Sequence, residues 1–173
     1  MGSSEGGILL VNNFLETVLT EWYNYQGYFV KNNVNYGKRQ AGGYIGEIDV
    51  LAYHPSMREL IHVETSTDAN KWSERVERIN QKFSNAKPYY RSILPGIDIE
   101  NTKRIAIYSL NQSVPENLSG VELDIELITI PQMFKEITEK LKTKNPAKEA
   151  VPENYPLIRA IQFASNYGYG RYQ

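Results

Sequence analysis

The chain contains no cysteine among its 173 residues. This absence excludes disulfide bonds, thiolate zinc sites and cysteine nucleophiles. The chain also lacks an apolar run of about 18 residues, the length that a membrane-spanning helix requires, so no membrane contact is expected. Its start lacks the basic segment and apolar stretch of a secretion signal. A cytoplasmic location is therefore the default expectation.

A strong charge of one sign is missing as well, because 19 Lys and Arg residues face 20 Asp and Glu residues. The charge is nevertheless unevenly spread, since residues 31–104 hold 12 Lys and Arg against 9 Asp and Glu. A mildly basic middle is compatible with binding to a phosphate backbone. A solvated helix face is the simpler explanation, so charge alone does not decide between them.

Length and composition predict one main domain. Apolar residues make up 41% of the chain and charged residues 23%, which are ordinary values for a globular protein. We interpret residues 1–7 as a flexible leader and residues 8–145 as an α/β domain. Residues 146–173 are interpreted as a C-terminal helix with a tyrosine- and glycine-rich tail, packed on that domain or extending from it.

Hydrophobic periodicity predicts the order of the secondary-structure elements. Strands are expected over residues 28–36, 45–53, 60–65, 104–110 and 123–130. Helices are expected over residues 8–25, 132–141 and 155–164, and over a segment that begins at a cap on Thr67 or Asp68 and ends near residue 89. This order indicates an α/β fold with a mixed central sheet of about five strands, flanked by helices.

Acidic residues interrupt the otherwise apolar second and third strands. If Tyr53 faces Leu60 across the turn between them, Asp49 on one strand lies opposite Glu64 on the other. Directly paired residues share a face of the sheet, and two facing carboxylates repel unless a cation or a shared proton relieves them. The hairpin therefore predicts a divalent-metal site, with a solvated sheet face carrying incidental acids as the alternative.

The same register assigns the other hairpin residues to two faces. Glu47, Leu51, His62 and Ser66 share the face of the two acids, whereas the opposite face carries Ile48, Val50, Ile61, Val63 and Thr65. We interpret His62 as a hydrogen-bonded structural residue, with a metal-binding role as the alternative.

Two predicted helices carry side chains that could reach the acids. Glu16 flanks the apolar stripe of the first helix, although an exposed helix acid is an equal interpretation. Lys71, Arg75 and Lys82 lie along one flank of the helix that follows the hairpin. If that helix packs on the sheet, such flanking side chains can extend over its edge toward the acids.

Residues 9–92 resemble the PD-(D/E)XK, or restriction-endonuclease-like, nuclease superfamily. Residues 46–52 (GEIDVLA) and 61–66 (IHVETS) are most similar to the YraN-like bacterial proteins, whose patterns are GEIDLIA and VFVEVK. Glu16 precedes a Gly-Tyr pair by the interval seen in that family. Lys82 and Ala86, followed by Tyr89 or Tyr90, match its helix with spaced Lys, Ala and Tyr.

The resemblance implies a restriction-endonuclease-like three-layer fold and a nuclease that uses Mg²⁺, or Mn²⁺ as a substitute, to hydrolyse DNA. It makes Asp49 and Glu64 the metal ligands, with Glu16 supporting them through water. Glu47 is either an additional outer ligand or only orients the loop over residues 37–43. The expected partner is DNA, and assembly as a homodimer is left open.

Ser66 departs from the family pattern, which has a lysine at this position. Ser66 carries no charge and cannot supply the electrostatic role of that lysine at the attacked phosphate. Either Lys82, as first candidate, or Lys71, as second, replaces it, or the site is inactive. The alternative function is an inactive domain of this fold that binds nucleic acid or assembles with proteins. A glycoside hydrolase acid–base pair is a third interpretation.

Overall fold

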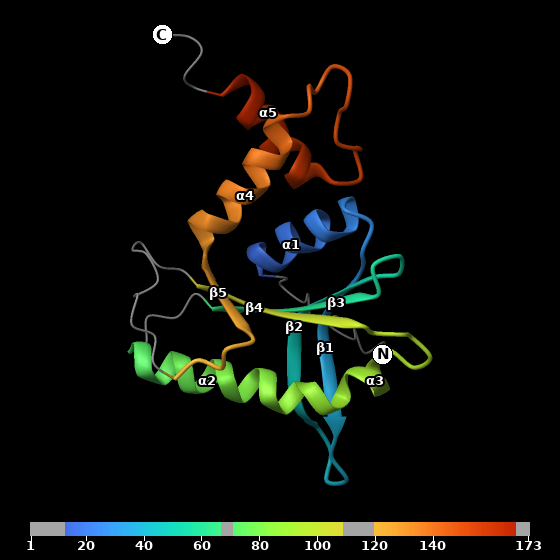
Figure 1. The fold of residues 1–173 in the computed structure, drawn as a ribbon, viewed down its shortest axis with the longest axis vertical. Coiled ribbons are helices and arrows are strands. Elements are labelled where there is room, and N and C mark those ends of the chain that lie inside the picture. Colours follow the sequence, from blue (N-terminus) through green and yellow to red (C-terminus); the bar gives the residue numbers. More distant parts are fainter. Residues whose placement is uncertain (1–12, 67–70, 109–119, 169–173) are drawn as a thin grey trace, which may run out of the picture.

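The computed structural model describes residues 13–66, 71–108 and 120–168 (Figure 1). Its strands are β1 (Phe29–Lys38), β2 (Tyr44–His54), β3 (Glu59–Ser66), β4 (Asn101–Tyr108) and β5 (Ile125–Thr129). Its helices are α1 (Phe14–Tyr25), α2 (Trp72–Ala86), α3 (Tyr90–Ile93), α4 (Ile130–Lys142) and α5 (Pro156–Tyr167), with a 3-10 turn at Lys87–Tyr89. The predicted order of elements is confirmed, with the short α3 as an addition.

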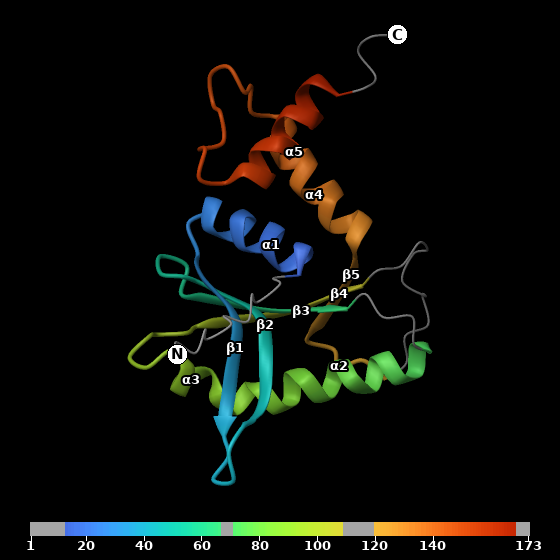
Figure 2. The same ribbon diagram turned by 180° about the vertical axis from the view of Figure 1, so that it is seen from behind.

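The five strands form one mixed sheet in the order β1-β2-β3-β4-β5. The β1–β2 and β2–β3 pairs are antiparallel, whereas β3–β4 and β4–β5 are parallel. Tyr53 pairs with Leu60 and Val50 with Val63, as the alternation predicted. The β2–β3 ladder ends at Val50–Val63, and beyond it β1 and β2 continue as a two-stranded ribbon (Figures 1 and 2).

Helices cover both faces of the sheet and make three layers (Figures 1 and 2). On one face, Val50 and Val63 pack in a common core with Leu19 of α1 and Ile137 of α4. On the other face lies α2, whose Phe83 is fully buried. The predicted α/β fold with a five-stranded mixed sheet is confirmed.

The C-terminal helix α5 packs on α1 and α4. Glu21 of α1 accepts hydrogen bonds from the backbone N–H groups of Leu157 (2.8 Å) and Ile158 (3.1 Å), which satisfies donors at the start of α5. Gln162 of α5 is fully buried and accepts a hydrogen bond from the N–H of Val151 (2.8 Å). The segment after α4 therefore shares the core of the sheet.

The start of α2 differs from the prediction. Lys71 precedes the first helical residue, Trp72, and its side chain makes no capping hydrogen bond. The cap expected at Thr67 or Asp68 is therefore wrong, because the helix begins several residues later; residues 67–70 lie outside the described segments. The later start leaves a longer connection between β3 and α2.

Ile48 also departs from the predicted alternation. It packs with Leu51 in the core beside α2, although the strand period places these two residues on opposite faces. Opposite Asp49, Asn33 has a φ of 51° and takes no part in the β1–β2 ladder. This left-handed residue interrupts the pleat, so the residues on either side of it are turned relative to one another.

The longest described helix is α2, with 15 residues. No helix in the described parts of the chain is both long and apolar enough to cross a membrane.

Candidate active site

Asp49 lies where β2 stops pairing with β3 and continues beside β1 alone. Its Oδ2 accepts hydrogen bonds from the backbone N–H (2.7 Å) and the hydroxyl group (3.1 Å) of Thr65 on β3. Because the β2–β3 ladder has ended one residue earlier, the carboxylate provides an acceptor at the position where a paired strand would have continued. These bonds orient the side chain and leave Oδ1 for other partners.

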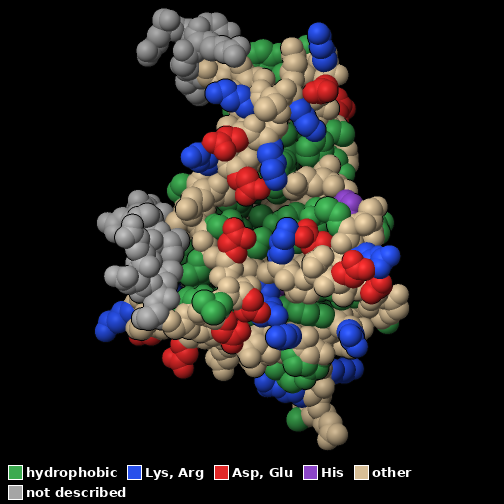
Figure 3. Space-filling view, in the orientation of Figure 1, with side chains coloured by type: hydrophobic (Ala, Val, Ile, Leu, Met, Phe, Trp, Pro, Cys, Tyr) green, Lys and Arg blue, Asp and Glu red, His purple; other side chains and the backbone are tan. Residues whose placement is uncertain are grey.

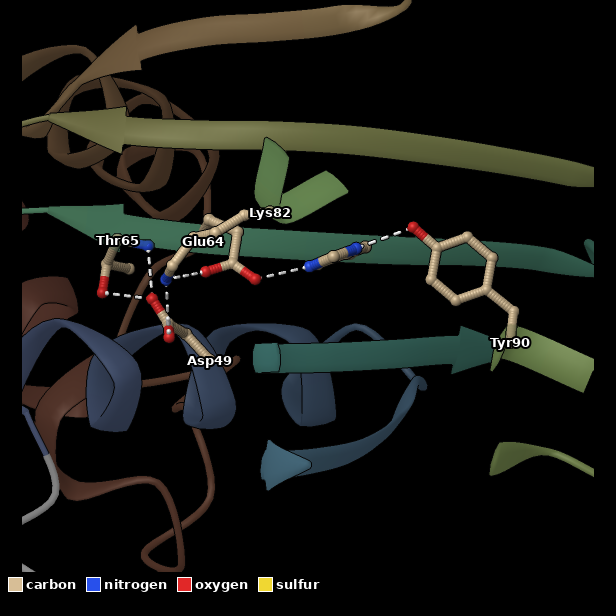
Figure 4. Close-up of polar contacts among 6 residues, drawn as sticks. Asp49, Glu64, Thr65, Lys82 and Tyr90 are labelled. Carbon is tan, nitrogen blue, oxygen red and sulfur yellow. Dashed lines mark hydrogen bonds and ion pairs between the residues drawn. The ribbon is translucent and has the colours of Figure 1, made fainter. Parts of the chain in front are cut away.

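Glu64 is held by a chain of buried hydrogen bonds (Figure 4). Its Oε1 lies 2.7 Å from Nε2 of His62, whose Nδ1 lies 2.7 Å from the Tyr90 hydroxyl oxygen. Burial lowers the pKa of His62 to about 3, so the ring is neutral and carries one N–H. Since an ionised carboxylate only accepts, Nε2–H donates to Glu64 and the Tyr90 hydroxyl donates to Nδ1. His62 therefore orients Glu64 from inside the core.

Lys82 reaches both carboxylates from α2. Its ammonium group donates to Oδ1 of Asp49 (3.5 Å) and to Oε2 of Glu64 (Figure 4). The Lys82 side chain is 38% exposed and that of Glu64 is 5% exposed, so the ammonium group lies at the solvent side of the pair. Lys71, the second candidate, stands about three helical turns earlier, about 16 Å along the axis.

Burial opposes the charges of this cluster. Burial raises the pKa of Asp49, and the nearby Glu64 raises it further, against the opposing effect of Lys82. Burial likewise raises the pKa of Glu64. Burial alone would lower the pKa of Lys82, but the two carboxylates outweigh it and raise the value. The single ammonium group of Lys82 therefore offsets only part of the unfavourable free energy of charging Asp49 and Glu64.

Glu16 and Glu47 form an outer pair of acids around Asn33. With its amide nitrogen turned toward them, Asn33 lies 3.3 Å from Oε2 of Glu16 and 3.3 Å from Oε1 of Glu47. Glu16 is buried on α1, and its pKa is raised by burial and then by repulsion from Asp49. The structure therefore brings Glu16 to the acids of the hairpin, whereas Glu47 lies exposed at their outer edge.

A cavity of about 140 Å³ opens beside Glu64 and Lys82. Its walls include Ser66 on β3 and the guanidinium-bearing side chains of Arg75 and Arg78 on α2. Arg75 is buried, with its guanidinium carbon 5.7 Å from the ring centre of Tyr108. The cavity is therefore lined by Glu64 and by three cationic side chains of α2, and Ser66 adds a wall without charge.

The donor set at Lys82 fits a hard divalent cation. Oδ1 of Asp49 and Oε2 of Glu64 converge on one ammonium group, and Mg²⁺ typically binds through one or two carboxylates while it keeps several waters. Their other oxygens are oriented by Thr65 and His62. Among the described side chains, no three His, Asp or Glu residues form a group that could hold a metal. The ligand role of Glu47 therefore stays a prediction.

Comparison with models of known protein families finds no match, and comparison with curated proteins finds none either. The likeness to PD-(D/E)XK nucleases therefore depends on the motif residues, and the activity that it implies is a proposal.

Three contributors to the site were not predicted. Alternation placed Thr65 on the face opposite Asp49, yet its N–H and hydroxyl bind that carboxylate. Tyr90 was matched only as a helix tyrosine of the family. Asn33 could have been found from the sequence, because asparagine is rare within strands and tolerates a positive φ better than most residues.

Proposed function

We propose that this protein is a metal-dependent hydrolase of phosphodiester bonds. Within that class, we propose an endonuclease that acts on DNA. The observation that carries the proposal is the position of the Lys82 ammonium group between Asp49 and Glu64. From α2, Lys82 supplies the cation that Ser66 does not supply on β3.

In the proposed reaction, Asp49 and Glu64 would hold Mg²⁺, or Mn²⁺ in its place, and Glu16 would support the site through water. The bound metal supplies stabilisation of the charge that develops on the attacked phosphate. Lys82 presents a fixed positive charge beside that phosphate and orients the attacking water. His62 keeps the rotamer of Glu64 unchanged during the reaction, because both of its ring nitrogens are hydrogen-bonded.

The cavity beside the carboxylates supports phosphate as the substrate group. Arg75 and Arg78 line it together with Lys82. A guanidinium group matches the geometry of phosphate and can bind two of its oxygens. A phosphate in this cavity would therefore lie next to the proposed metal ligands and the lysine at the same time.

A non-catalytic domain is the second candidate, and the same ion pair favours it. An ammonium group between two buried carboxylates offsets part of their charge and can stabilise a fold without any metal. In that case Ser66 marks a lost site, and the domain binds nucleic acid or assembles with proteins. The two candidates differ in whether Asp49 and Glu64 bind a divalent metal.

Incubation of plasmid, single-stranded and branched DNA with Mg²⁺ or Mn²⁺ tests the proposal. We expect cleavage that Asp49→Asn and Lys82→Ala each slow by about 10²–10³-fold, the usual cost of losing a group that stabilises transition-state charge. As a matched control, Lys103→Ala removes a half-exposed lysine of β4 that pairs with Glu59 (2.7 Å). We expect this variant to cleave at the wild-type rate.

The contrary result has two parts. If the wild-type protein cleaves none of these substrates, and calorimetric titration with Mn²⁺ detects no binding that depends on Asp49, the second candidate replaces the first. Cleavage that survives Asp49→Asn would instead place the active site elsewhere in the molecule.

A further inference from the structure

The β1–β2 ribbon projects from the body of the protein as an arm, which we define as residues 37–45. Both ribbon views show it extending past α2 (Figures 1 and 2). Tyr36 and Ile48 are the last buried residues before it on the two strands. Beyond them the two strands pair only with each other, ending with Lys38 opposite Tyr44.

The arm is ordered by its own turn. The N–H of Arg39 donates to the carbonyl of Gly43 (3.0 Å), and the N–H of Gly42 donates to the carbonyl of Arg39 (3.1 Å). Gly42 and Gly43 have φ values of 93° and 76°, which are unfavourable backbone conformations for residues with a side chain. Added Cβ atoms there would meet nothing within 4 Å. The glycines therefore serve the backbone geometry, and they keep the tip narrow.

The arm carries positive charge and exposed apolar side chains but no negative charge. Lys38 and Arg39 are the only charged residues between positions 37 and 45, and both are exposed. Two large apolar side chains accompany them, Tyr44 at 46% exposure and Ile45 at 40%. Basic and apolar groups thus share a narrow projection, which complements a surface that offers phosphates at its edges and apolar groups between them.

Strand β2 connects the arm to Asp49 of the candidate active site. Asp49 lies on β2 at the base of the ribbon, where the β2–β3 ladder has just ended. Lys82 and the cavity lined by Arg78 lie on the neighbouring α2. A long polyanion whose backbone enters that cavity would therefore pass the base of the arm as well.

We propose that residues 37–45 enter the major groove of double-helical DNA, with Lys38 and Arg39 on its phosphates and Tyr44 and Ile45 against base edges. The major groove is about 12 Å wide and admits a two-stranded ribbon, whereas the minor groove, about 6 Å wide, is too narrow. This inference rests on the proposed function, and it makes duplex DNA, in preference to single strands, the substrate that the site receives.

Fluorescence anisotropy with a short labelled duplex, in EDTA so that no cleavage occurs, tests the arm separately from catalysis. We expect Lys38→Ala/Arg39→Ala to weaken duplex binding by about tenfold. The slope of log K against log salt should fall by about 2, close to one for each lost phosphate contact. We expect Tyr44→Ala/Ile45→Ala to weaken binding without changing that slope.

Lys142→Ala/Lys148→Ala is the matched control. It removes two exposed lysines from the end of α4 and the loop after it, on the far side of the sheet from the arm. We expect this variant to bind duplex as the wild type does. Thermal unfolding of all variants should stay unchanged, because the substituted residues lie outside the buried cores.

Several results would overturn the inference. One is duplex affinity and salt slope that are unchanged in the Lys38→Ala/Arg39→Ala variant, and another is equal binding of duplex and single strand. A third is a dimer in sedimentation experiments that the arm substitutions dissociate while duplex binding persists. If the protein binds duplex through the arm but never cleaves DNA, the inference about the arm stands and the proposed catalysis is refuted.

Discussion

Strand β3 carries two buried acids, Glu59 at its start and Glu64 near its end, and each of them meets a lysine. Glu59 pairs with Lys103 (2.7 Å) and accepts a hydrogen bond from the Tyr28 hydroxyl (2.6 Å). Glu64 pairs with Lys82 and is hydrogen-bonded to His62. The pKa of Glu59 nevertheless lies below its ordinary value, whereas that of Glu64 lies above it.

The two pKa shifts differ because the acids are buried to different depths and because Glu64 shares its lysine with a second acid. Burial tends to raise the pKa of both acids, but at Glu59 the hydrogen bonds from Lys103 and Tyr28 outweigh it. Glu64 is the more deeply buried, with 5% of its side chain exposed against 11% for Glu59, and it shares its lysine with Asp49. An acid with a cation of its own is typical of a structural ion pair, whereas Asp49 and Glu64 share one lysine and both have raised pKa values, a perturbation that is common at functional sites.

The face of the molecule drawn in the orientation of Figure 1 carries side chains of both signs. Acidic and basic side chains alternate across that face (Figure 3). The unequal balance at Glu64 is therefore a local property of the site and does not reflect the net charge of −1.

The largest effect that we expect concerns His62, the buried hydrogen-bond partner of Glu64. His62→Ala should lower the free energy of unfolding by about 3 kcal/mol, because it opens a cavity and removes the buried hydrogen-bond partner that Oε1 of Glu64 and the Tyr90 hydroxyl share. His54→Ala, at the other histidine of the chain, should cost less than about 1 kcal/mol, since His54 is half-buried at the end of β2. Urea unfolding measures both, and equal losses would remove the distinction between the two ends of β3.

Removal of each lysine sharpens the comparison further. In EDTA, Lys82→Met should lower the free energy of unfolding by about 2 kcal/mol, because the buried Glu64 and the partly buried Asp49 lose their common cation. Lys103→Met should cost about 0.5 kcal/mol, as expected for a half-exposed pair. Mn²⁺ should restore the stability of the Lys82 variant and leave the Lys103 variant unaffected. A Lys82 variant that does not respond to Mn²⁺ would contradict the proposed metal site.

The smallest effect concerns the pH dependence of Glu59. Because its pKa is lowered on folding from the ordinary 4.5, the ionised group stabilises the fold above pH 4.5, and this stabilisation is lost as pH falls through the folded pKa. Glu59→Gln should therefore lower the free energy of unfolding by about 1 kcal/mol at pH 7 and by less at pH 3. Urea midpoints at the two pH values measure the change, and an equal loss at both would show that the charge contributes nothing.

Much of the fold follows from patterns that are local in the chain. The register assumed for the hairpin, with Tyr53 opposite Leu60, is confirmed. The ladder ends at Val50–Val63, one pair before Asp49 and Glu64, but Lys82 contacts both acids. The capping box of Thr129 and Gln132 at the start of α4 is equally local. Alternation failed at Ile48, because the left-handed Asn33 on the neighbouring strand interrupts the ladder.

The sequence by itself indicated which two acids come close, because side-chain direction along a strand has a period of two and the hairpin register was assumed correctly. Only the tertiary structure decided which lysine reaches them. Lys71 precedes the first residue of α2 and Lys82 lies within it, so the choice depends on where α2 begins and how Phe83 and Ile79 seat it on the sheet. Such packing joins residues distant in the chain, so local periodicity cannot specify it. The same packing places His62 and Tyr90 behind Glu64, and with them the orientation of the candidate ligand.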